Sequence, residues 1–120
     1  MKYTDWIKEN EDGNVQEYIA FCRSNGQQID LSMAYLSGAN LRWANLREAD
    51  LRWATLREAD LRWANLSEAD LSGATLREAD LREADLSGAD LSEADMVNID
   101  LTGANLTRVI TQPVARKEQK

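Results

Sequence analysis

The chain has 120 residues, 21 of them acidic and 14 basic, with a formal net charge of −7. One cysteine and no histidine exclude an internal disulfide framework, the usual zinc sites and histidine-based catalysis. No apolar run could cross a bilayer and no charged-then-apolar leader opens the chain, so we expect a cytoplasmic protein. Leu, Ile, Val and Phe together supply only about a fifth of the chain, while Ala, Glu, Leu, Lys and Arg are abundant. Composition alone therefore favours either disorder or long helix.

Residues 1–28 are predicted to form a small α-helical cap. Asn14 is a suitable N-cap, and Gly26 lies where the following helix would end. A short turn over residues 4–8 is expected to bring Trp6 onto the same apolar cluster. The apolar face of the predicted helix consists of Val15, Tyr18, Ile19 and Cys22.

From Ile29 onward the sequence follows a five-residue repeat. Leucine occupies the centre of each unit from Leu31 to Leu106, with Met96 as the single replacement, which gives 16 units. Alanine stands two residues before most centres, with Asp, Asn or Thr between them. Five residues rotate by about 500° around the axis of an α-helix, so successive leucines would not lie on one face of a helix. In a flat strand, successive leucines would alternate between the two faces. The period therefore fits neither regular structure.

A chain that turns once per unit satisfies this pattern. Ala and Leu then face one interior, while the residue between them faces water and the two residues after Leu form an outward corner. Four units would close a square coil, although the period alone does not distinguish four sides from three. Such a coil has a narrow core that Ala and Leu can fill, and the helical cap is expected to cover its first edge.

Residues 49–53 (Ala-Asp-Leu-Arg-Trp) and 89–93 (Ala-Asp-Leu-Ser-Glu) resemble the pentapeptide-repeat family. The family pattern is a small residue, Asp or Asn, a central Leu or Phe, and two variable residues. The resemblance covers residues 29–109 and implies an all-β solenoid, a right-handed quadrilateral β-helix of about four coils. Residues four units apart would then stack in columns. The predicted organisation is a cap at 1–28, the β-helix at 29–109 and a C-terminal segment at 110–120.

The C-terminal segment has no comparable cap. Pro113 cannot donate to a neighbouring coil and marks the end of the repeat, and the basic tail after it is expected to be disordered. Apolar residues at an uncapped edge suggest an end-to-end homodimer, and the resemblance implies the same, because family members often dimerise through their C-terminal coils. The candidate contact residues are Val109, Ile110 and Val114.

Negative charge is concentrated in the second half of the repeat. Residues 65–109 hold ten acidic and three basic residues, whereas residues 29–64 hold five of each. The predicted columns place Asp50, Asp70 and Asp90 on one face and Asp60, Asp80 and Asp100 on the opposite face. Their simplest role is structural, because Asp and Asn satisfy backbone groups at turns. Stacked carboxylates repel, however, so either arginines and salt offset the repulsion or the surface binds a cationic partner.

The resemblance implies one such partner. Some bacterial pentapeptide-repeat proteins mimic duplex DNA, bind DNA gyrase and protect it from quinolones. A negative rod fits a cationic groove that binds phosphates, so one hypothesis is a decoy for a DNA-binding protein such as a topoisomerase. Leucine rather than Phe at the centres and the lack of a loop between coils count against quinolone protection.

Three Arg-Trp pairs offer a second binding surface. They recur at every second unit, at predicted outward corners, and Trp and Arg are the residues most enriched in interface hot spots. A purely structural alternative is that each indole shields the neighbouring coil. The candidate interface residues are Trp43, Trp53, Trp63, Arg42 and Arg62.

No feature of the sequence indicates catalysis. The carboxylates are regular and exposed, with no cleft that would desolvate one of them, and a core filled by Ala and Leu leaves no pocket. We therefore expect no enzyme activity, cofactor, metal site or direct nucleic-acid binding. A third possibility is a consensus-like or designed structural repeat with no dedicated partner, because the units are unusually uniform.

Overall fold

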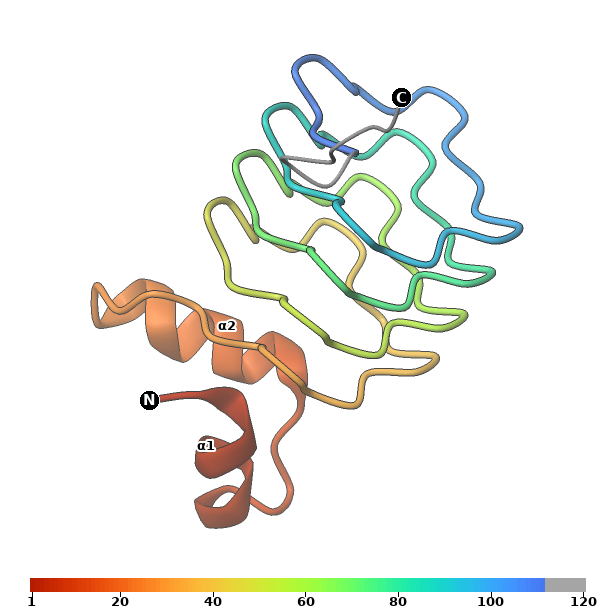
Figure 1. Ribbon diagram of the computed structural model, residues 1–120. Helices are drawn as coiled ribbons and strands as arrows, with labels where there is room; N and C mark the ends of the chain where they lie inside the picture. The colour runs from red at the N-terminus through yellow and green to blue at the C-terminus, as the bar shows by residue number, and fades with distance from the viewer. Residues whose placement is uncertain (112–120) are drawn as a thin grey trace, which may run out of the picture.

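The computed structural model describes residues 1–111. Two helices, α1 (Tyr3–Glu9) and α2 (Val15–Ser24), lie at one end of a stack of coils (Figure 1). Parallel bridges join each coil to the next, from Asp30 with Asp50 to Asp90 with Ile110, so that bridged residues are four units apart. This register confirms the predicted columns. No helix in the described part of the chain has the length and apolar character needed to span a membrane.

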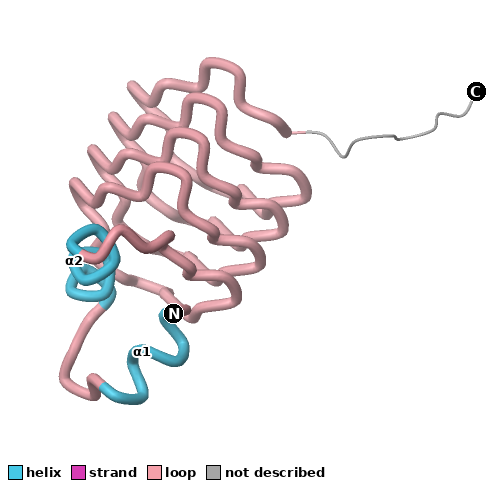
Figure 2. The backbone as a smooth tube through the Cα atoms, turned by 90° about the vertical axis from the view of Figure 1, so that its left-hand side faces the viewer, coloured by secondary structure: helices cyan, strands magenta, loops and turns pink. Residues whose placement is uncertain are grey.

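Each five-residue unit contributes one corner. The N–H of Ala34 donates to the C=O of Leu31 across the corner (3.1 Å), and the same bond recurs through every unit to Val109 and Leu106 (3.2 Å). One corner per unit and a register of four units per coil give four corners per coil, which the period alone left open. The straight segments between corners are too short for more than a single bridge each. Residues 1–111 contain isolated bridges and no longer strand, so the expected all-β class is not confirmed by the secondary structure (Figure 2).

The third residue of every corner has a positive φ. Twelve of these residues are not glycine and have φ between 59° and 64°, and four are glycines with φ between 72° and 75°. A positive φ at this position is typical of a type II turn and costs an L-residue about 1–2 kcal/mol. Twelve corners therefore carry strain that the packing and hydrogen bonds of the coil must offset.

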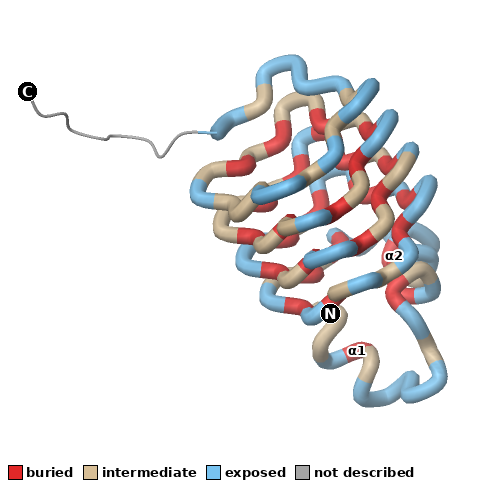
Figure 3. The backbone as a smooth tube through the Cα atoms, turned by 90° about the vertical axis from the view of Figure 1, so that its right-hand side faces the viewer, coloured by how far each residue is buried: buried red, intermediate tan, exposed pale blue. Residues whose placement is uncertain are grey.

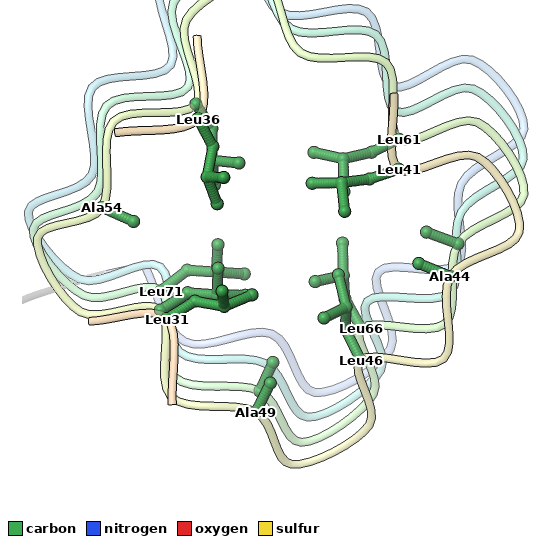
Figure 4. Packing of buried hydrophobic residues seen from close by; sticks show 14 of the residues in the cluster. Leu31, Leu36, Leu41, Ala44, Leu46, Ala49, Ala54, Leu61, Leu66 and Leu71 are labelled. Carbon is green, nitrogen blue, oxygen red and sulfur yellow. The ribbon is translucent and has the colours of Figure 1, made fainter. Parts of the chain in front are cut away.

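Leucine side chains fill the centre of the solenoid. Every central leucine from Leu41 to Leu86 has no exposed surface. Seen along the axis, leucines from the four sides meet in the middle, and alanines such as Ala44 and Ala54 lie farther out, near the corners (Figure 4). The core is thin enough that small and medium side chains fill it, which explains the low content of large aliphatic residues.

Three backbone hydrogen bonds per unit link each coil to the next. The N–H of Leu31 donates to the C=O of Asp50 (2.7 Å), and the N–H of Met33 donates to the C=O of Arg52 (2.9 Å). In return, the N–H of Asp50 donates to the C=O of Ile29 (2.9 Å). Each unit thus directs two N–H groups and one C=O toward the C-terminal end of the solenoid. Toward the N-terminal end it directs one N–H and two C=O groups.

The two helices pack on the N-terminal end of the solenoid. Asn14 caps α2 as predicted: its side chain accepts the N–H of Glu17 (3.0 Å), whose carboxylate accepts the N–H of Asn14 (3.1 Å). The predicted face of α2 is buried, and Cys22 has no exposed surface. Residues 3–9 form a complete short helix rather than the expected turn, and Trp6 on this helix is buried.

Side chains of the cap satisfy backbone carbonyls of the first coil. The side-chain amide of Gln16 donates to the C=O groups of Asn40 (3.2 Å) and Arg42 (3.3 Å). The guanidinium of Arg23 donates to the C=O groups of Asn45 (2.8 Å) and Arg47 (3.1 Å). The side-chain amide of Gln28 donates to the C=O of Glu48 (3.2 Å). The N–H of Tyr3 donates to the C=O of Asp30 (2.8 Å). These cap groups are all donors, which suits an end that presents mainly acceptors.

Candidate partner-binding surfaces

Both predicted aspartate columns form. Parallel bridges connect Asp50 to Asp70 and Asp70 to Asp90, and others connect Asp60 to Asp80 and Asp80 to Asp100. All but Asp100 are half-buried rather than fully exposed.

Each of these carboxylates also stabilises its own corner. The Oδ1 atom of Asp70 accepts the backbone N–H of Ser72 (3.0 Å) and its hydroxyl (2.6 Å). The bond to the N–H two residues ahead occurs in all six members, at 2.9 to 3.3 Å. These aspartates therefore have the structural role expected of Asp in turns.

Arginines neutralise the column of Asp60, Asp80 and Asp100. The guanidinium of Arg62 lies 2.7 Å from Asp60 and 3.7 Å from Asp80, and that of Arg82 bonds to Asp80 and lies 3.8 Å from Asp100. Hydrogen bonds from these arginines hold the pKa of Asp60 and Asp80 below the usual range. Sequence reasoning missed Arg82, although its position one full coil after Arg62 is a signal that could have found it.

The opposite column is neutralised only in part. Arg52 lies 2.8 Å from Asp50 and 4.0 Å from Asp70, whereas residues 1–111 provide no ion pair for Asp90. Uncompensated negative charge on this face is therefore concentrated toward the C-terminal coils.

Two of the three predicted tryptophans form a stack. The rings of Trp43 and Trp63 lie 5.1 Å apart and are nearly parallel, at 6°. They remain 70% and 48% exposed. Arg42 precedes Trp43 in the chain; its Nε lies 3.7 Å from the carboxylate of Asp60 and donates to Oδ1 of Asn40 (3.4 Å).

Trp53 lies on another corner and is 60% exposed. Its ring packs so closely over Gly73 that a Cβ atom added there would lie 2.5 Å from the ring. Trp43, which stacks on Trp63, and Trp53, which lies over Gly73, therefore each cover part of the following coil, as the structural alternative expects, while more than half of each side chain stays exposed.

A pairing across two coils was not predicted. Arg108 lies 3.5 Å from Glu68, two coils earlier, and Gly88 stands between them in the same column. A glycine with opposite charges one coil before it and one coil after it would have been the signal.

Residues 1–111 contain no group of three His, Cys, Asp or Glu side chains placed to hold a metal ion.

No part of residues 1–111 covers the C-terminal side of the last described coil. The final bond between coils joins the N–H of Leu91 to the C=O of Ile110 (2.6 Å). Leu106 and Ile110 are 43% and 46% exposed, and Val109 is half-buried. The coil at this end of the stack is coloured mainly as exposed or intermediate (Figure 3). Val114 and the rest of the basic tail lie outside the described residues.

Comparisons with known proteins agree with this geometry. The family model for pentapeptide repeats matches residues 34–73 and 69–108. The crystal structure of alr5209, a pentapeptide-repeat protein from Nostoc PCC 7120, is 41% identical, covers 72% of this chain and 70% of its own, and has a TM-score of 0.67.

A pentapeptide-repeat protein from the thylakoid lumen of Arabidopsis thaliana, AT2G44920, is 37% identical over 67% of this chain and 63% of its own, with a TM-score of 0.48. No curated protein matches the chain. The family model alone covers more than half of the sequence, in the register that the bridges show. The chain therefore belongs to the pentapeptide-repeat family.

Proposed function

We propose that this protein is a non-catalytic protein-binding module whose partner docks on the corners of Trp43 and Trp63. The observation that carries this proposal is the stack of two exposed indoles on hydrogen-bonded corners. Exposed Trp beside Arg is typical of interface hot spots, and a preorganised corner loses little conformational entropy on binding. The acidic columns are less available, because their carboxylates bond to their own corners.

The test is affinity capture with W43S/W63S, which should lower recovery of the specific partner about tenfold. The matched control is E58S/E78S, which changes the same corner position in another column. Both variants should unfold cooperatively, as followed by circular dichroism. Equal recovery of the same proteins by all three chains would contradict the proposal and would favour a structural repeat with no dedicated partner.

A second candidate function is that of a decoy for a cationic DNA-binding protein such as a topoisomerase, for example DNA gyrase. It is favoured by the net charge of −7 in residues 65–109 and by the incompletely paired column of Asp70 and Asp90. Capture of such a protein should weaken steeply with salt and should be lost in D70N/D90N, because attraction between exposed charges is screened. Capture that resists salt would contradict this candidate.

We also propose a homodimer through the open C-terminal coil. Leu106 and Ile110 expose apolar surface there, next to Val109. Light scattering at high micromolar concentration should give twice the chain mass, and L106K should give the monomer mass. A monomer for the unaltered chain would contradict the proposal.

We further propose that the coil is a right-handed quadrilateral β-helix, as membership of the family implies. A crystal structure would test the hand of the coil directly, and a left-handed winding would contradict it.

A further inference from the structure

The helical cap leaves one side of the first coil open. In the second coil, Thr55 bonds twice to the coil before it: its N–H donates to the C=O of Ala34 (2.9 Å), and its C=O accepts the N–H of Leu36 (2.7 Å). Tyr35 occupies the same position one coil earlier, and no hydrogen bond joins its N–H or C=O to any of residues 1–111. An open edge of this kind is a template on which another chain can pair.

A groove of about 400 Å³ lies over this edge. Tyr3, Val15 and Gln16 line it from the cap, and Tyr35, Leu36 and Ser37 line it from the coil. The C=O of Ser37 also bonds to none of the described residues. The groove therefore offers two backbone acceptors and one donor beside apolar side chains.

Exposed apolar side chains border the open edge. Tyr35 is 77% exposed, and Met33, two residues earlier, is 70% exposed. No other large apolar side chain in the described part of the chain is more exposed than Tyr35. Apolar surface left in water next to an unpaired edge favours contact with a second chain.

The cap side of the groove is strongly acidic. A neighbouring cavity of about 610 Å³ shares Gly13 with the groove and is lined by four carboxylate side chains and no basic residue. These carboxylates belong to Glu9, Glu11, Asp12 and Glu17. A segment that enters the groove beside this cavity is attracted if it carries positive charge.

We propose that an extended, basic peptide segment of a partner protein pairs with the first coil at Tyr35. Its main chain repeats the contacts that Ala34, Leu36 and Gly38 make with the second coil. One C=O accepts the N–H of Tyr35, and two N–H groups donate to the C=O groups of Tyr35 and Ser37. This is strand addition to a sheet edge, a general mode of peptide recognition. The site includes neither Trp43 nor Trp63, so it stands apart from the function proposed above.

The probe is a fluorescent peptide, Lys-Arg-Ala-Lys-Leu-Lys-Gly-Arg, whose binding to the full chain is followed by anisotropy. A version with Pro in place of Leu lacks one of the two donating N–H groups, and a version with Glu in place of every Lys and Arg reverses the charge. Each change should weaken binding about tenfold. W43S/W63S should bind the basic peptide as the unaltered chain does.

Two variants of one residue separate main-chain pairing from side-chain contact. Y35P removes an N–H that bonds to nothing in the described residues, and proline is tolerated at sheet edges, so the melting temperature should stay unchanged while affinity falls about tenfold. Y35T keeps the N–H and matches Thr55 and Thr75 in its column, so it should bind within about threefold of the unaltered chain.

Hydrogen exchange on the unaltered chain gives a readout that needs no variant. The amide of Tyr35 should exchange more slowly when the basic peptide is present. Unchanged exchange, equal binding of the acidic peptide, or equal binding by Y35P would overturn the proposal. A Tyr35 amide that is already protected in the full chain, and exposed in a chain ending at Thr111, would assign the groove to the chain's own C-terminal segment instead and would also overturn it.

Discussion

A residue held at positive φ is strained unless it is glycine, and two glycines of this solenoid separate that strain from packing. Gly38 and Gly73 have nearly the same φ, 72° and 74°, at the same corner position. A Cβ atom on Gly38 would meet nothing within 4 Å, whereas one on Gly73 would lie 2.5 Å from the ring of Trp53. G38A should therefore cost only the backbone term, about 1 kcal/mol.

G73A should cost about 1–3 kcal/mol more than G38A, because the indole must also move. Urea unfolding of both variants measures the difference. In a W53A background the losses of stability caused by G38A and G73A should become equal, because the indole that would clash with a Cβ at position 73 is absent. Equal costs for G38A and G73A in the presence of Trp53 would show that the ring does not pack over this corner.

Helix α2 covers the first coil and supplies hydrogen-bond donors to its carbonyl groups. The guanidinium of Arg23 donates to the C=O groups of Asn45 and Arg47 and to Oδ1 of Asn45. R23M keeps the aliphatic stem and removes these bonds, so we expect it to lower the free energy of unfolding by about 1–2 kcal/mol.

K8M is the matched control for that prediction. It removes a cation from α1 whose ion pair with Asp5 spans 3.7 Å and is largely exposed, so its effect should be below about 0.5 kcal/mol. Chemical denaturation measures both variants. An R23M chain as stable as K8M would mean that the carbonyls of the first coil are equally well satisfied by water.

The aspartate columns make the stability of the entire protein depend on pH. Hydrogen bonds from arginine hold the pKa of Asp50, Asp60 and Asp80 below the usual range. A carboxyl with a lower pKa in the folded state stabilises the fold above its unfolded pKa and loses that contribution as the pH falls through the folded pKa. The free energy of unfolding should therefore decrease as the pH is lowered from about 4.

Urea titrations at several pH values test this dependence, with R62Q/R82Q as the comparison. Without the two arginines the pKa of Asp60 and Asp80 should return toward the usual range, so the loss of stability on acidification should be smaller. An identical pH profile for both chains would contradict the role given to the arginines.

Local patterns made much of this molecule predictable. The five-residue spacing of leucine predicts a thin shared interior, and Asn14 with the stripe ending at Cys22 predicts α2. The open edge at Tyr35 could not be foreseen, because it depends on how the helices dock and which carbonyls their side chains reach. Arginines that offset the aspartate repulsion were one of the expected alternatives, but the bridging of two aspartates by Arg62 was not identified, since it requires residues of successive coils to be considered together.

The unequal hydrogen bonds between coils have an electrostatic consequence. Because every unit points two N–H groups and one C=O toward the C-terminal end, the peptide dipoles do not cancel along the axis. The solenoid therefore carries a net dipole with its positive pole at the last coil, the reverse of an α-helix. Its negative pole meets Arg23 and the amides of Gln16 and Gln28, and the acidic residues 65–109 lie toward its positive pole. The charge asymmetry of the repeat thus complements the dipole of its own backbone.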